Sequence, residues 1–315
     1  NTVQRNTAVG AYAALCNTTG QQNVAIGYYT LDANTTGACN VSIGGNLGNN
    51  TTGGGNIAIG NSALANNSTC SDNVAVGRAA AQETNSAHGI VAIGALALCK
   101  NTSGDNNTAV GFCSLVCNTT GASNVAVGLN ALDANTTGSR NTSVGFASLG
   151  SNNGAGAQDT AIGYEAGINN TTGVNNIFVG DSAGADAMIN VTTASQQIVL
   201  GTNAHTNATI KIDWTVTSDL RDKTEIADVP CGLDFVNQIT PIKYKFKTSR
   251  EDETPIGRAR YGFKAQEILE LEGDNPVLVN NDDEENLKLT GAYLVPVLVN
   301  AIKELKAEID ELKKK

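Results

Sequence analysis

The sequence predicts a mainly β protein, in which a shaft of stacked 17-residue coils precedes a small α+β domain that ends in a long coiled-coil helix. Three observations support this fold class. A motif of the form Asn-x-Ala-Ile/Val-Gly recurs at a nearly constant spacing up to residue 201. Aromatic residues make up only 4% of the chain, which is little for a globular core of this length. All five prolines lie after residue 229, so the composition changes within the chain.

The recurring motif ends on a glycine in each of its twelve copies. These are Gly10, Gly27, Gly44, Gly60, Gly77, Gly94, Gly111, Gly128, Gly145, Gly163, Gly180 and Gly201. The step between them is 17 residues, apart from single steps of 16, 18 and 21. A fixed period of this length indicates stacked units, none of which can bury a core alone. We therefore expect a shaft of about twelve coils over residues 1–201.

Each repeat contains two apolar stretches separated by Asn/Thr/Gly turns, which predicts a coil with roughly two strands. Alternation within "NVAIG" directs Val24 and Ile26 to one face and Ala25 to the other. Stacked coils place asparagine over asparagine about 4.8 Å apart, which predicts amide ladders. Glycine is expected where the backbone turns with a positive φ. Alanine and serine dominate one face, and we expect that face to lie against other chains.

The rest of the chain has a different pattern. Residues 202–217 are predicted to form a connecting strand, and residues 218–315 a separate domain. Within this domain "CGLDFVNQIT" predicts a helix, "PIKYKFK" an alternating strand, and "YGFKAQEILEL" a strand that runs into a helix. The last helix carries an a/d seam, which implies a partner helix. The seam consists of Val295, Leu298, Ile302, Leu305, Ile309 and Leu312. Pro296 either kinks this helix or marks its first turn.

A charged hexamer, "SDLRDK", lies where the composition changes, and in it Ser218 and Lys223 are five residues apart. A serine hydroxyl attacks a carbonyl only when a base removes its proton. A lysine acts as that base only when uncharged, which burial or a nearby cation favours. Arg221 is a candidate for the cation. The other interpretation of the hexamer is a solvated loop with an incidental serine and lysine.

Two parts of the chain resemble known families. The repeats resemble those of viral tail fibres and, less closely, the head repeats of trimeric autotransporter adhesins. The segments "SDLRDK", "LDFVNQITPIKYKFK", "YGFKAQEILE" and "AYLVPVLVNAIKELKAEIDEL" follow in this order. Together they resemble the C-terminal intramolecular chaperone of endosialidases, over roughly Asp213 to Leu312. That resemblance implies a domain that trimerises, guides the preceding stalk to fold and then cuts itself off.

The resemblance also implies roles for individual residues of the hexamer. Ser218 becomes the nucleophile and Lys223 its base, with the scissile bond between Thr217 and Ser218. Asp219 and Arg221 match the motif as supporting residues. Such a cut occurs once per chain, so the activity is that of a single-turnover serine peptidase with a Ser-Lys dyad.

The sequence therefore predicts the stalk of a homotrimeric tail fibre or appendage in a virion, with its chaperone domain released in the host cytoplasm during assembly. The alternatives are a β-helical polysaccharide depolymerase or an adhesin carrying the same chaperone. A depolymerase needs two carboxylates roughly 5 to 9.5 Å apart. The shaft has only nine acidic residues, among them Asp32 and Asp133, which lie at equivalent positions six coils apart.

The remaining composition bears on partners and cofactors. A net charge of −10 argues against binding to nucleic acid or to an anionic membrane. No apolar run approaches the roughly 20 residues of a membrane span. The isolated His88 and His205, and the absence of a C-x-x-C pair, argue against a metal site, and no cofactor is predicted. A host-cell receptor or polysaccharide is the further partner that a tail fibre suggests.

Overall fold

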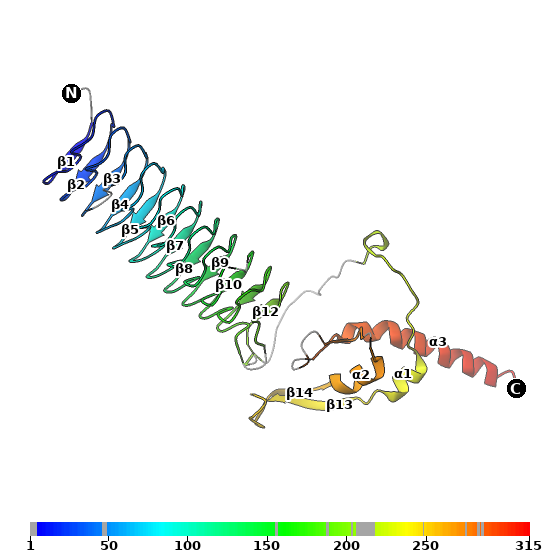
Figure 1. Cartoon of the computed structure of the whole chain (residues 1–315). Coiled ribbons are helices and arrows are strands. Elements are labelled where there is room, and N and C mark those ends of the chain that lie inside the picture. Colours follow the sequence, from blue (N-terminus) through cyan, green and yellow to red (C-terminus); the bar gives the residue numbers. More distant parts are fainter. Residues whose placement is uncertain are drawn as a thin grey trace. The chain divides into compact units, whose positions relative to one another are not determined.

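The structure is a computed structural model that describes residues 5–45, 49–154, 157–186, 189–202, 204–205, 218–247, 249–274, 276–281, 284 and 287–315. The chain divides into two compact units, Asn1–His205 and Thr206–Lys315 (Figure 1). The strand expected over residues 202–217 falls mostly outside the described residues, and so does Thr217.

The first unit is a solenoid in which three-residue strands stack into one 12-stranded parallel sheet (Figure 1). The strands pair in register, with Val24 beside Val41 and Ile26 beside Ile43. They are β1 (Thr7–Val9), β2 (Val24–Ile26), β3 (Val41–Ile43), β4 (Ile57–Ile59), β5 (Val74–Val76), β6 (Val91–Ile93), β7 (Thr108–Val110), β8 (Val125–Val127), β9 (Thr142–Val144), β10 (Thr160–Ile162), β11 (Ile177–Val179) and β12 (Ile198–Leu200). The predicted repeat solenoid is confirmed.

The expectation of two strands per coil is wrong: the described coils have one strand each. The Ala/Leu stretch after the glycine folds into turns instead. In the second coil Tyr29 and Leu31 have φ values of 54° and 52°, in the left-handed region. A backbone that alternates in this way cannot pair as an extended strand.

The interior of many coils is filled by small strand residues together with one leucine. In β2, Ala25 is fully buried while Ile26 is 38% exposed, so the predicted alternation is confirmed. Leu31 is buried in the same core. The expectation that the alanine face lies against other chains is wrong. A coil of 17 residues leaves room only for small side chains beside its leucine, so the alanines line the inside.

Asparagine ladders satisfy most of the side-chain polar groups buried inside the described coils, and the predicted amide ladders are confirmed. The Asn34 side chain donates to Asn17 Oδ1 at 2.9 Å, and the Asn50 side chain donates to Asn34 Oδ1 at 3.0 Å. In a second ladder the backbone N–H of Asn40 donates to Asn23 Oδ1 at 2.9 Å. An unpaired buried amide would cost about 1–3 kcal/mol, so the ladders allow the turns to be buried.

The glycine that ends each strand is required both by its backbone and by its neighbours. Gly10 has a φ of +127°, which L side chains rarely adopt. A Cβ at this position would lie 2.4 Å from the carbonyl oxygen of Gly27 in the next coil. The close stacking of coils therefore depends on glycine at this position.

Near the end of the shaft one phenylalanine replaces the usual small interior residue. Phe178, the central residue of β11, is fully buried. Gly167 and Gly184 occupy, one and two coils later, the repeat position that Leu149 holds. A Cβ at Gly167 would lie 2.6 Å from Phe178 Cδ2, and one at Gly184 would lie 2.5 Å from Phe178 Cδ1. The ring thus fills the volume that leucine side chains fill elsewhere.

One member of the asparagine ladder is an aspartate, Asp159, and it is fully buried. Its carboxylate accepts hydrogen bonds from the backbone N–H of Asn176 at 2.8 Å and from the Asn170 side chain at 3.0 Å. Burial raises the pKa of Asp159 to about 6, although these donors act in the opposite direction. When the Asp159 carboxylate is charged, its burial therefore lowers the free energy of unfolding.

We expect Asp159→Asn to stabilise the shaft near neutral pH. The pKa of Asp159 is higher in the folded protein than in the unfolded chain. The loss of stability caused by the buried charge is therefore absent below about pH 4 and complete above about pH 6. At pH 8 the substitution should raise the thermal midpoint by a few degrees, followed by circular dichroism, and at pH 4 it should change little. An equal shift at both pH values would contradict this assignment.

The second unit is a small α+β fold. Its elements are a 3₁₀ turn (Leu220–Asp222), α1 (Leu233–Gln238), β13 (Ile242–Lys247), β14 (Pro255–Gly262), α2 (Ala265–Glu272), β15 (Val279–Asn280), β16 (Lys288–Leu289), a 3₁₀ turn (Gly291–Tyr293) and α3 (Leu294–Leu312). The β13–β14 and β15–β16 pairs are antiparallel. The helix, strand and strand–helix segments predicted from the sequence are all present. Pro296 lies in the first turn of α3, where a missing N–H is tolerated.

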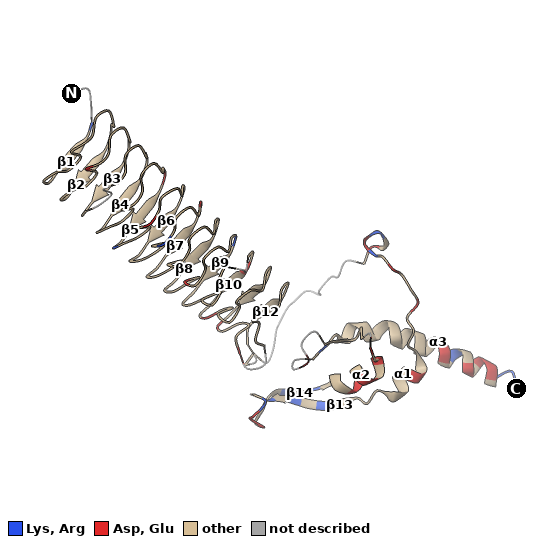
Figure 2. Ribbon diagram, in the orientation of Figure 1, with Lys and Arg blue, Asp and Glu red and all other residues tan. Residues whose placement is uncertain are grey.

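A compact core holds this unit together. Phe235 of α1 and Ile268 of α2 pack with Leu294 and Val297 of α3. Most of the charge of the chain also lies here, while the shaft is nearly uncharged (Figure 2). In the described part of the chain, no helix has the length and apolar character needed to cross a membrane.

Candidate active site

The hexamer "SDLRDK" folds into a single 3₁₀ turn, Leu220–Asp222, with Asp219 as its N-cap. The Asp219 carboxylate accepts a hydrogen bond from the backbone N–H of Arg221 at 2.9 Å. The backbone N–H of Lys223 donates to the carbonyl of Leu220 at 3.2 Å. An aspartate at an N-cap satisfies a free N–H at the start of the turn, so the sequence itself favours this local structure.

The turn brings the two predicted catalytic side chains together. Lys223 Nζ lies 2.8 Å from Ser218 Oγ and donates a hydrogen bond to it. A tight turn of three residues between the two positions folds the chain back on itself, which accounts for the contact across five residues. This distance is within the range over which a base takes the proton of a nucleophile.

Arg221 and Asp219 form an ion pair beside this contact. Arg221 Nη2 donates to Asp219 Oδ2 at 2.6 Å, and Arg221 Nε donates to Asp219 Oδ1 at 3.1 Å. These bonds hold the pKa of Asp219 below its usual value. The pairing offsets the charge of Arg221, which weakens its case as the cation that activates Lys223. The two residues instead stabilise the turn that lies between Ser218 and Lys223.

Both members of the dyad are exposed to solvent in the single chain. A lysine is uncharged more readily where water is excluded, and among the described residues Lys223 is exposed. The described residues therefore place the two predicted catalytic side chains within hydrogen-bond distance and leave both of them exposed to water.

Two residues of α3, which the sequence-based interpretation did not single out, fix the segment that follows the hexamer. The Asn300 side chain donates to the carbonyl of Val229 at 3.0 Å. The Glu304 carboxylate accepts from the backbone N–H of Leu233 at 2.6 Å. Both residues sit among the polar positions between members of the a/d seam, so their spacing alone did not distinguish them from solvated residues.

Comparison with known proteins agrees with the resemblance of the C-terminal motifs. Residues 218–278 match the model of a peptidase family described as the chaperone of endosialidase. The match begins at Ser218 and continues through α1, β13, β14 and α2. The search of curated proteins and the search of solved structures returned no match. The C-terminal region is therefore similar to the endosialidase chaperone family over residues 218–278, and it follows a β-solenoid.

Proposed function

We propose that the chain is the stalk of a viral tail fibre or appendage that assembles as a homotrimer, after which its C-terminal chaperone is released in the host cytoplasm. Release occurs by a single cut between Thr217 and Ser218. The observation that carries this proposal is the 2.8 Å contact between Lys223 Nζ and Ser218 Oγ. The start of the family match at Ser218 supports the same boundary.

The chemistry needs no group beyond this dyad and water. Uncharged Lys223 takes the proton of Ser218 Oγ while the oxygen attacks the carbonyl carbon of Thr217. The bond from that carbon to the Ser218 nitrogen breaks, the nitrogen takes up a proton, and an ester replaces the amide. Water then hydrolyses the ester, leaving a carboxylate on Thr217 and a free amine and hydroxyl on Ser218.

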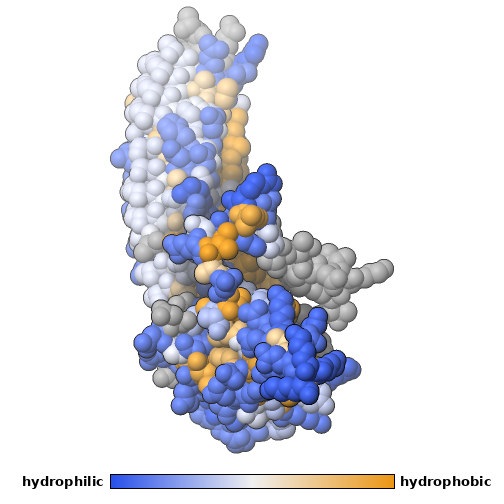
Figure 3. All heavy atoms as spheres, turned by 90° about the vertical axis from the view of Figure 1, so that its right-hand side faces the viewer, coloured by the Kyte–Doolittle hydropathy of each residue, from blue (hydrophilic) through white to orange (hydrophobic). Residues whose placement is uncertain are grey.

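An apolar line of side chains along the shaft supports assembly with other copies. The last residue of most strands is a Val, Ile or Leu that is exposed in the single chain. We call this set the aliphatic stripe: Val9, Ile26, Ile59, Ile93, Val127, Val144, Ile162, Val179 and Leu200. Figure 3 shows hydrophobic residues gathered along one edge of the shaft. An apolar strip of this length is unusual on a monomer and favours burial against identical stripes.

The predicted a/d seam of α3 supports the same conclusion. All six seam residues are exposed, from 41% at Ile309 to 68% at Leu312. Leu294, Val297 and Ala301 on the same helix are instead buried, the first two in the core. The seam is thus left open in the single chain. Ile at a with Leu at d favours dimers by itself, so the shaft and the chaperone core must enforce the trimer.

Assembly and cutting are linked through α3. Its seam joins chains, while its Asn300 and Glu304 hold the segment that follows Lys223. When three helices associate, these contacts carry the hexamer to the interface. A neighbouring chain can then exclude water from Lys223 and favour its uncharged form. In this scheme the cut follows correct assembly.

Native mass spectrometry of the purified protein, followed by N-terminal sequencing of its fragments, tests the proposal. We expect a trimer of shafts that end at Thr217, together with a fragment that begins at Ser218. A stable uncut monomer at micromolar concentration would contradict both parts of the proposal. A trimer cut at another bond would contradict the dyad alone.

A further inference from the structure

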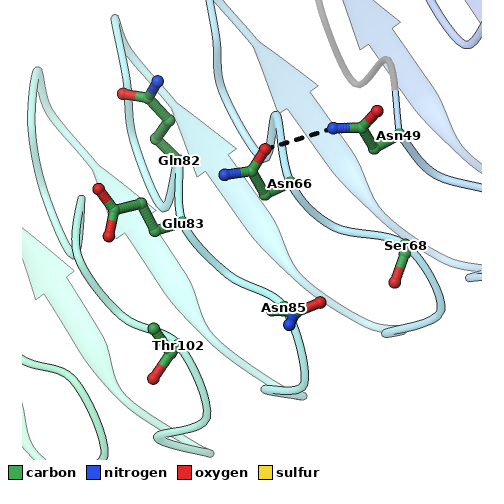
Figure 4. Close-up of a pocket in the computed structure, with 7 residues that line it drawn as sticks. All are labelled: Asn49, Asn66, Ser68, Gln82, Glu83, Asn85 and Thr102. Atoms are coloured by element: carbon green, nitrogen blue, oxygen red, sulfur yellow. Dashed lines mark hydrogen bonds between the residues drawn. The ribbon is translucent and has the colours of Figure 1, made fainter.

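A polar groove runs along the shaft over its second to sixth coils. One hollow of about 580 Å³ is lined by residues that include Asn49, Asn66, Gln82, Glu83 and Asn85 (Figure 4). An adjoining hollow of about 400 Å³ shares Asn49, Asn66 and Gln82, and extends to Tyr29 and Asp32. Because three residues line both hollows, they form one continuous surface, which we call the amide groove.

The amide groove lies away from the aliphatic stripe. Asn66 follows Ile59, the last strand residue of its coil, by seven positions in a repeat of 17. It is therefore about half a turn from the stripe. Chains that associate through their stripes leave this side of each shaft open to solvent.

At the repeat position of Asn66, the groove coils carry larger polar residues than several other coils do. The groove has Asn49, Asn66 and Glu83 there, whereas Ala33, Cys117, Ala134 and Ser151 are small. Larger polar residues also occupy this position at Lys100 and Asn169, outside the groove lining. Asn49, Asn66 and Glu83 are all exposed, so the change adds hydrogen-bonding groups to the surface without filling the core.

The interior of the same coils also departs from the repeat. Thr84, which lies between Glu83 and Asn85, replaces a member of the asparagine ladder. Within the part of the chain that the structure describes, Thr84 Oγ1, Asn50 Oδ1 and Asn67 Oδ1 are buried without a hydrogen-bond partner, and so is Asn135 Oδ1 outside the groove. Such groups destabilise a fold and concentrate at functional places. The coils that carry the groove thus depart from the repeat in their interior, at Thr84, as well as on their surface.

We propose that the amide groove binds a neutral oligosaccharide laid along the shaft. Amide side chains both donate and accept hydrogen bonds, as sugar hydroxyls do. Tyr29 adds an aromatic ring, which can pack against the apolar face of a sugar. Coils about 4.8 Å apart repeat these groups at a spacing close to that of sugar units in an extended chain.

The charges of the groove restrict the ligand class. The lining of the two hollows includes two acidic residues, Asp32 and Glu83, and no Lys or Arg. An anionic glycan would be repelled by these carboxylates, whereas neutral hydroxyls can donate to them. The two acids lie three coils apart, or about 14 Å, which is too far for paired carboxylates in glycoside hydrolysis. The groove is therefore suited to binding and not to cleavage.

Affinity electrophoresis of the full-length protein tests this assignment. Native gels would contain dextran, mannan, galactan or xylan, and a parallel gel would contain the acidic polymer hyaluronan. We expect at least one neutral polymer to slow the protein and hyaluronan to leave its mobility unchanged. The Asn66→Ala/Gln82→Ala double variant should bind that polymer about tenfold more weakly, because two hydrogen-bonding side chains are lost.

Asn169→Ala provides the matched control. Asn169 occupies the repeat position of Asn66 outside the groove, and its side chain donates a hydrogen bond to Asn190 Oδ1 of another coil at 2.9 Å. Asn66 makes a similar contact, since its Oδ1 accepts a hydrogen bond from the Asn49 side chain at 3.3 Å. This variant should bind as the wild type does. The assignment is overturned if no neutral polymer slows the protein, if hyaluronan binds best, or if the double variant keeps its affinity. It is equally overturned if the Asn169 control loses as much affinity as the double variant.

Discussion

Lys223→Ala is expected to block the cut between Thr217 and Ser218 while leaving the protein assembled. Folding uses the packing surfaces of the chaperone, whereas cutting uses one proton acceptor, which lies 2.8 Å from Ser218 Oγ. Loss of a catalytic base or nucleophile slows such reactions by roughly 10³-fold or more, which over one assembly cycle leaves the chain intact. Boiled gel samples should show a full-length chain, and unboiled samples a trimer.

Three further variants make this experiment specific. Ser218→Ala should give the same uncut trimer, because it removes the attacking oxygen. Lys223→Arg should also remain uncut, since arginine stays protonated and cannot act as a base. Lys314→Ala removes an exposed lysine beyond α3 and should be cut normally. Efficient cutting of the Lys223→Ala protein would remove the dyad from the proposed mechanism.

The stacked solenoid could be predicted from the sequence because a repeat constrains its own fold. Equal coils must place like residues over like, so the asparagine ladders and the glycine stack followed from the period alone. The number of strands did not follow, because the left-handed backbone at Tyr29 and Leu31 leaves no trace in residue type. Nor did the direction of the alanines, since alternation separates two faces without saying which one is inside.

The candidate site could be predicted only in part. The roles predicted for Ser218 and Lys223 rest on the resemblance to the endosialidase chaperone, and the chemistry of a serine nucleophile with a lysine base is consistent with them. The ion pair of Arg221 with Asp219 depends on the shape of a 3₁₀ turn, which the letters "SDLRDK" do not specify. Asn300 and Glu304 each contact a residue that lies 71 positions earlier in the sequence. Contacts at that separation depend on the tertiary fold.

The shaft without its chaperone, residues 1–217 expressed alone, is expected to aggregate or to remain unassembled. Nearly equal coils allow a chain to slip by 17 residues against its neighbours while most contacts between stripes are kept. After such a slip, Ile26 lies where Val9 should be, and both are exposed aliphatic residues. Little energy therefore separates the correct alignment from a staggered one, and staggered chains leave apolar ends that recruit further chains.

A domain that trimerises at the C-terminal end of the shafts sets their alignment, because the three chains then begin to associate at equivalent residues. Size-exclusion chromatography of the soluble fraction measures the effect, with the uncut Lys223→Ala protein as the reference for trimer yield. Fusing residues 1–217 to an unrelated trimeric coiled coil should restore part of that yield, since alignment is what the shaft lacks. If residues 1–217 alone give soluble trimers at the reference yield, the shaft sets its own register. The exposed seam of α3 would then have to serve a purpose other than assembly.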